Sequence, residues 1–285
     1  MTAAAFSLRS RLGEGLAEAA KLPAFLRRDL LVALSYRAAL AGDFLQLGLQ
    51  ALLFSFIGKL VDPATLPSYG GTRAGYMEFV AIGIVLSLVT GLLLMRVATA
   101  VRQEQMIGTL ESLLTTPTAT STVQIGSAAF DLLLVPVRMA LLLLAIALTF
   151  GLDFDASGVL PSLAVFAAFI PFVWGLGLIS AGAILTFRRG VGVMGAGVTA
   201  MGLASGAYFP LSLLPGWLQT LAEANPIAIA ISGVREALIG GSGWAAIGGD
   251  ALLLGGLSAG ALATGVVAFR VALRRERRRG TLGLY

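Results

Sequence analysis

The sequence contains no cysteine and no histidine, and only 12% of its 285 residues are charged. The lack of these two residue types excludes disulfides, thiol redox chemistry and the usual ligands of zinc, haem and copper. A soluble domain of this length carries about 25% charged residues, so the scarcity of charge excludes that class. Hydrophobic residues make up 57% of the chain and the mean hydropathy is +0.90, which indicates an integral membrane protein.

Lysine occurs only twice, and the positions of the two lysines exclude an ATP site in this chain. A phosphate-binding loop needs Gly-x-x-x-x-Gly-Lys followed by Ser or Thr, so that backbone amides and the lysine meet the phosphates. Lys21 follows alanines, and Lys59 follows Gly58 but precedes Leu60. We therefore expect no cofactor in this chain, and any ATP-driven process requires a motor in another chain. The same lack of His and Cys, with no clustered acids in the apolar stretches, argues against an enzyme.

Long uncharged windows predict an all-α membrane protein, because crossing the hydrocarbon takes about 20 helical residues. A charged stretch before residue 38, without an apolar core, argues against a secretory leader. Within it, residues 22–37 are typical of an interfacial amphipathic helix. The six predicted transmembrane helices are 39–60, 76–96, 125–150, 160–186, 190–209 and 248–270.

The basic residues predict the orientation of these spans. Sixteen of the 20 Lys and Arg residues lie in the N-terminal tail, the loops after the second and fourth spans, and the C-terminal tail. The opposite side receives only Lys59, Arg73 and Arg235. The positive-inside rule then places both termini in the cytoplasm of what we expect to be a bacterial cell. The net charge of +5 is thus a topology signal, with some attraction to membrane lipid, and we expect no nucleic-acid partner.

Residues 102–117, in the loop after the second span, form a two-faced segment that Pro117 ends. Glu104 and Glu111 lie on its polar side, where they are expected to bind basic groups on a partner. The pattern alone is equally compatible with a helix that lies on the membrane surface with solvated acids. Helical spacing places one apolar stripe opposite them: Met106, Ile107, Leu110, Leu113 and Leu114.

The stretch between the fifth and sixth spans is apolar but interrupted by proline and glycine. Apolar segments of about 10–14 residues are typical of re-entrant or interfacial structure. We interpret residues 208–240 as two half-helices that dip into the outer leaflet and form an outer gate; the alternative is a surface hairpin anchored by Trp217 and Trp244. The predicted gate residues are Pro210, Pro215, Trp217, Asn225 and Pro226.

Two of the spans carry further signals. Asp131 and Arg138 lie on the third span, and a charge at that depth should face protein or water. They either line a translocation path or serve structure, with Arg138 extended toward the interface or bonded to carbonyls. On the fifth span, Gly192, Ala196 and Ala200 recur at four-residue spacing, which favours close helix packing and a seam with a second copy.

Two motifs at separate places carry a family resemblance. The segment 108–117 reads GTLESLLTTP, and the segment 208–219 reads YFPLSLLPGWLQ, followed by Asn225 and Pro226. Together with the six-span layout, they resemble the ABC-2 family of transporter permeases over roughly residues 25–270. The segment differs mildly from the family pattern, because Gln105, Met106 and Ile107 stand where family members often have more charge.

The resemblance implies a membrane-spanning permease that exports an amphipathic or lipid-linked substrate. It implies a homodimer with two copies of a separate ABC ATPase subunit that holds ATP and Mg²⁺. The alternative from another class is an ion-coupled secondary transporter with no ATPase. The resemblance also makes 102–117 a coupling helix in the ATPase cleft, with contacts from Glu104, Ile107, Gly108, Thr109, Leu110, Glu111 and Leu114. The expected organisation is a tail with the interfacial helix (1–38), a six-span domain (39–270) and a basic cytoplasmic tail (271–285).

Overall fold

Long helices dominate the computed structural model, which describes residues 22–35, 37–58, 60, 66–107, 137, 139–187 and 190–279. Two helices precede the bundle, α2 (Leu22–Ser35) and α3 (Arg37–Gly58), and a small antiparallel hairpin follows, β1 (Ser68–Tyr69) with β2 (Thr72–Arg73). The remaining elements are α4 (Tyr76–Ile107), a helix over Met139–Phe150, the 3-10 turn η2 (Ala156–Gly158), α7 (Val159–Phe187), α8 (Gly190–Leu203), η3 (Leu211–Leu213), α9 (Gly216–Glu223), α10 (Pro226–Leu238) and α11 (Trp244–Arg279).

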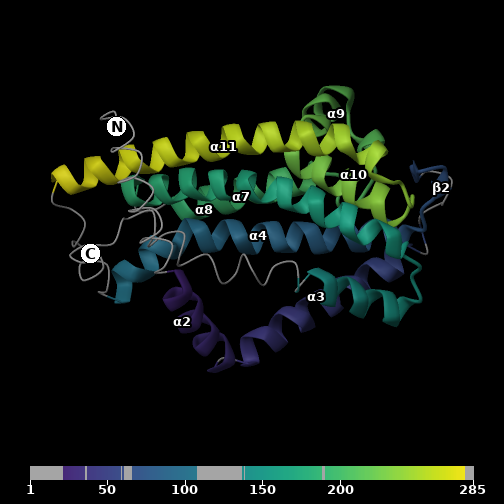
Figure 1. Ribbon diagram of the computed structural model, residues 1–285, viewed down its shortest axis with the longest axis horizontal. Coiled ribbons are helices and arrows are strands. Elements are labelled where there is room, and N and C mark those ends of the chain that lie inside the picture. The colour runs from purple at the N-terminus through teal and green to yellow at the C-terminus, as the bar shows by residue number, and fades with distance from the viewer. Residues whose placement is uncertain are drawn as a thin grey trace, which may run out of the picture.

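Helices α4, α7 and α11 lie side by side, with α7 between the other two (Figure 1). Small residues allow this close packing. A Cβ atom at Gly175 of α7 would overlap the backbone of Ala261 in α11, and one at Gly265 of α11 would overlap Gly175. Backbones in contact gain dispersion energy along the whole length of the helices, which matters in a membrane because lipid offers no hydrophobic drive for association.

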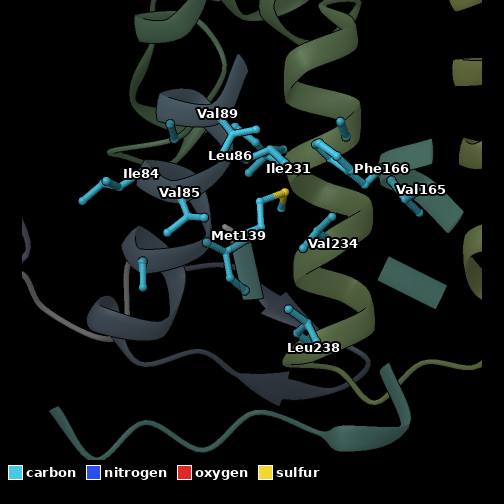
Figure 2. Packing of buried hydrophobic residues seen from close by; sticks show 14 of the residues in the cluster. Ile84, Val85, Leu86, Val89, Met139, Val165, Phe166, Ile231, Val234 and Leu238 are labelled. Carbon is cyan, nitrogen blue, oxygen red and sulfur yellow. The ribbon is translucent and has the colours of Figure 1, made fainter. Parts of the chain in front are cut away.

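Helix α10 is short but deeply inserted among the long helices. Asn225 caps its first turn and Pro226 occupies its start, where a missing N–H costs nothing. It packs against α7, α11 and α4, and Figure 2 shows Met139 between α4 and α10. The buried side chains labelled there are Ile84, Val85, Leu86, Val89, Met139, Val165, Phe166, Ile231, Val234 and Leu238.

Three helical stretches in the described residues are long and apolar enough to cross a membrane: Tyr76–Met95, Ala156–Ile184 and Ala246–Arg275. They coincide with the predicted second, fourth and sixth spans. The third predicted span is described only in part, as the apolar helix Met139–Phe150. Helices α3 and α8 lie at the first and fifth predicted spans, but the six-span count itself stays a prediction.

The bundle has two distinct ends. The hairpin, α9 and α10 lie at one end of the molecule, while the last residues of α4 and α11 lie at the other (Figure 1). The predicted outer segment and the start of the predicted coupling segment, residues 102–107, are therefore at opposite ends of the bundle.

Candidate functional site

Helix α8 ends at Leu203, before the residue 209 that the apolar pattern predicts as its end. The cause is the backbone at Gly206, whose φ of +70° is a left-handed conformation that a helix cannot contain. The chain then turns through Ala207 and continues into η3 and α9. We call residues 204–238, from this turn to the end of α10, the outer segment.

Asn225, a predicted gate residue, holds the two sides of the outer segment together. Its side-chain oxygen accepts a hydrogen bond from the Ile227 N–H at 3.1 Å, which caps α10. Its Nδ2 donates to the carbonyls of Met201 at 3.0 Å and Ala204 at 3.5 Å, near the end of α8. One buried amide side chain thus supplies hydrogen bonds to a backbone N–H at the start of α10 and to backbone carbonyls at the end of α8.

The other predicted gate residues do not converge on one point. Pro210 is buried and precedes η3, while Pro215 is exposed and precedes α9. Trp217 is 71% exposed on α9, and Pro226 begins α10. The structure brings Asn225 to the end of α8, and leaves Trp217 on the surface.

Arg235 on α10 is the most strongly bound side chain of the outer segment, with an exposed fraction of 3%. Its Nε and Nη2 donate to the Phe79 carbonyl at 3.0 and 2.8 Å. Nη1 donates to the Gly206 carbonyl at 2.9 Å, and Nη2 also donates to the Ala207 carbonyl at 3.1 Å. The guanidinium therefore binds α10, α4 and the turn after α8 to one another.

Burial lowers the pKa of Arg235 to about 10, although the nearby Tyr69 hydroxyl acts in the opposite direction. The guanidinium is still protonated at neutral pH, so α10 carries a buried positive charge. Three carbonyl oxygens and the Phe79 ring, whose centroid lies 3.5 Å from the guanidinium carbon, stabilise that charge.

Charge counting places Arg235 only among the basic residues on the outer side. Helical spacing would have found its burial, because Ile227, Ile231, Val234 and Arg235 fall on one face of a helix. An arginine on an otherwise apolar face must find acceptors inside the protein.

Glu236 ties the hairpin to the chain that follows α10. Its Oε1 accepts from the Gly70 N–H at 2.8 Å and from the Ser242 hydroxyl at 2.7 Å. Burial raises the pKa of the Tyr69 hydroxyl in the same hairpin, and the charge of Arg235 counteracts part of that rise. The hairpin that leads into α4 is therefore attached to the outer segment at two neighbouring residues of α10.

An apolar groove of about 590 Å³ lies between the helix Met139–Phe150 and helices α7 and α10. Leu143, Leu163 and Phe166 are among its walls, and Asp153 also lines it. The predicted path residues Asp131 and Arg138 lie outside the described residues. In the part of the chain that the structure describes, no group of three or more acids could hold a metal ion.

The opposite end of the bundle carries the start of the predicted coupling segment. Glu104 and Ile107 belong to the last turns of α4, which continues without a break from Tyr76. The five further coupling residues lie outside the described residues: Gly108, Thr109, Leu110, Glu111 and Leu114. Their contacts stay a prediction.

Comparison with known proteins supports the interpretation of this chain as a helical membrane protein. No curated protein gives a significant match to the chain. The family model described as "ABC-2 type transporter" matches residues 21–239, which includes both α4 and the whole outer segment. The chain therefore belongs to the ABC-2 type transporter family and is the membrane permease component of an ABC transporter.

Proposed function

We propose that this permease exports an amphipathic or lipid-linked substrate, driven by ATP hydrolysis in two copies of a separate ABC ATPase subunit. The observation that carries the proposal is the continuity of α4. This helix runs for 32 residues from the outer segment to Ile107, where the predicted coupling segment continues. A displacement at the ATPase end is therefore carried to the outer end by one element.

The motor belongs in another chain because this sequence lacks a phosphate-binding loop. Neither Lys21 nor Lys59 has the glycines and the following Ser or Thr that such a loop needs. ATP and Mg²⁺ would then bind in the partner subunit, which would receive the 102–117 segment. Glu111 and Glu104 would contact basic groups there.

The apolar groove supports an amphipathic substrate. Its walls are mostly aliphatic and aromatic, and Asp153 is a polar residue among them. Such a groove suits a hydrocarbon portion, whereas a strongly hydrated sugar or ion would lose its water without replacement. The bound outer segment supports export, because it is positioned to close the outer end of the bundle between transport cycles.

A second copy of the chain would complete the transporter. Ala196, Gly197 and Ala200 are exposed on α8, where small residues allow a neighbouring helix to approach closely. Helix α3 also exposes large apolar side chains, including Leu45 and Phe56. These faces support a homodimer in the cell membrane, with both termini on the cytoplasmic side.

Copurification followed by transport in vesicles tests the proposal. The tagged permease, extracted in mild detergent, should bring down a soluble protein that contains a phosphate-binding loop. Glu111→Arg should weaken that association by at least about tenfold, as expected for a charge reversal at an interface. The matched control is Glu223→Arg on exposed α9, at the opposite end of the bundle, which should retain the partner.

Proteoliposomes then distinguish the two classes of transporter. ATP-driven export predicts uptake into inside-out vesicles that persists when ionophores collapse the ion gradients. Loss of transport on gradient collapse, with ATP still present and no ATPase recovered after cross-linking, would favour the ion-coupled secondary transporter instead.

A further inference from the structure

Arg235 connects three segments that are far apart in the sequence. Its hydrogen bonds reach Phe79 at the start of α4, and Gly206 and Ala207 in the turn after α8. These acceptors are backbone carbonyls, so the connection fixes the main chain itself and not merely neighbouring side chains. All three nitrogen atoms of the planar guanidinium take part, which restrains both distance and orientation.

The hydrogen bonds of Arg235 are also shielded from water. Arg235 is 3% exposed, so water does not replace a bond that breaks. Separating α4 from α10 would deprive a buried charge of the Phe79 carbonyl and ring, and the loss of buried partners is strongly disfavoured. Apolar packing elsewhere between the two helices has no such restraint, because packed helices can slide by small amounts.

The backbones of α4 and the outer segment also touch each other directly. A Cβ atom at Gly83 would overlap the carbonyl group of Ala207. The residue that Arg235 binds in the turn is therefore also pressed against α4. In the described residues, a second hydrogen bond between α4 and this turn joins the Tyr76 hydroxyl to the Tyr208 carbonyl, but it is long, at 3.4 Å.

Helix α4 is suited to carry force from its other end. It spans 32 residues, or about 48 Å, and contains no proline that would kink it. Its last residues, including Glu104 and Ile107, begin the segment proposed to enter the ATPase. Asn225 joins α10 to the end of α8, so the parts of the outer segment near Arg235 are attached to each other as well.

We propose that Arg235 is the positioning residue that makes the outer segment move with α4, so that displacement of α4 by the ATPase opens and closes the outer gate. The inference rests on the proposed function. It predicts that the Arg235 bonds persist through the cycle while the outer segment shifts against α11.

Distances between spin labels test this in the permease–ATPase complex. The absence of natural cysteines lets labels be placed without background. One pair, Thr220→Cys with Ala246→Cys, reports the outer segment against α11. A second pair, Gly75→Cys with Thr220→Cys, reports the outer segment against the start of α4. All three positions are exposed.

The expected result, with Arg235 intact, is that the α11 pair changes its distance between the nucleotide-free and the vanadate-trapped complex while the α4 pair does not. A change in the α4 pair of the same size as in the α11 pair would overturn the inference even if no Arg235 variant folds. If the ATPase does not bind, or if transport does not require ATP, the proposed function itself fails.

Variants then test the role of the guanidinium. Arg235→Lys keeps the charge but cannot bind three carbonyls, so ATP hydrolysis should continue while transport falls by at least about tenfold, within the usual 5–150-fold range of coupling between sites. The α11 pair should lose its nucleotide-dependent change. Tyr76→Phe, which removes the long hydrogen bond from the same region, should retain transport and the distance change. Normal transport by folded Arg235→Lys would overturn the inference.

Discussion

Arg235 binds Phe79 twice over: two of its nitrogens donate to the Phe79 carbonyl, and its guanidinium carbon lies 3.5 Å from the centroid of the Phe79 ring. The backbone carbonyl and the ring of Phe79 thus both stabilise the charge of Arg235. Phe79 is itself 1% exposed, so the pair is enclosed by protein. This arrangement explains how a charged residue is retained on a helix whose neighbours are apolar.

Replacing Arg235 with methionine should destabilise the permease by about 3–5 kcal/mol, less whatever the apolar side chain regains by packing. The Gly206 and Ala207 carbonyls would remain buried without a donor. Arg235→Lys should lie between methionine and the wild type, because the ammonium can still donate to one or two carbonyls. Thermal unfolding in detergent, followed by fluorescence, measures the order. A melting temperature for Arg235→Met equal to that of the wild type would show that these bonds contribute little.

The contact between Gly83 and Ala207 gives a prediction with an internal control. Gly83→Ala should destabilise the protein by about 1–3 kcal/mol, because the new methyl group overlaps the Ala207 backbone and α4 must shift. Gly91→Ala on the same helix meets no atom within 4 Å and should be neutral or stabilising by up to about 1 kcal/mol. Parallel melting curves compare the two. Equal effects at both positions would remove the close approach as the explanation.

The apolar pattern located the helices better than it located their ends. The predicted spans at 76–96 and 160–186 coincide with α4 and α7, but α4 continues to Ile107. Hydropathy reports where a membrane ends, whereas a helix ends where the backbone is interrupted. Between Arg96 and Ile107 no proline or glycine interrupts it. Helix α8 shows the opposite case. The sequence stays apolar through Gly206, but the backbone at Gly206 has a positive φ that a helix cannot contain, so the helix ends before the apolar stretch does.

Tertiary contacts determine which apolar side chains are buried and which groups the buried arginine binds. A phenylalanine on an apolar span can face lipid or pack inside the protein, and the structure buries both Phe166 and Phe169. The helix at 227–238 was predictable from its spacing and its Asn225-Pro226 start, and it is present as α10. The partners of Arg235 were not predictable, because carbonyls of residues 79, 206 and 207 carry no signature in the sequence.

The turn before α7 should make stability depend on pH through Asp155. Hydrogen bonding from the Ser157 side chain, and from the Ser157 N–H at 2.8 Å, to its carboxylate lowers the pKa of Asp155 below its usual range. A lowered pKa in the folded state means that the stabilisation is present at neutral pH and is lost as the pH falls through the folded pKa.

Asp155→Asn tests that dependence, because asparagine can still cap the turn but does not titrate. The melting temperature of the variant should fall less than that of the wild type between pH 6 and about pH 3, the range that includes an ordinary aspartate pKa. Asp153→Asn, which removes one exposed acid from the same loop, controls for the change in net charge. Parallel pH profiles for Asp155→Asn and the wild type would contradict the assigned role.

A cysteine scan should show which face of the permease meets a second copy. Because the chain has no cysteine, a single Ala200→Cys introduces the only thiol. If the small residues of α8 form the seam, two such thiols lie close enough for oxidation to join the copies, since disulfides require Cα atoms within about 7 Å. Leu252→Cys on α11, where the leucine is 80% exposed, should remain monomeric on denaturing gels. Cross-linking in native membranes at Leu252 but not at Ala200 would place the seam on α11 and exclude α8, because both positions are exposed and only proximity to a second copy distinguishes them.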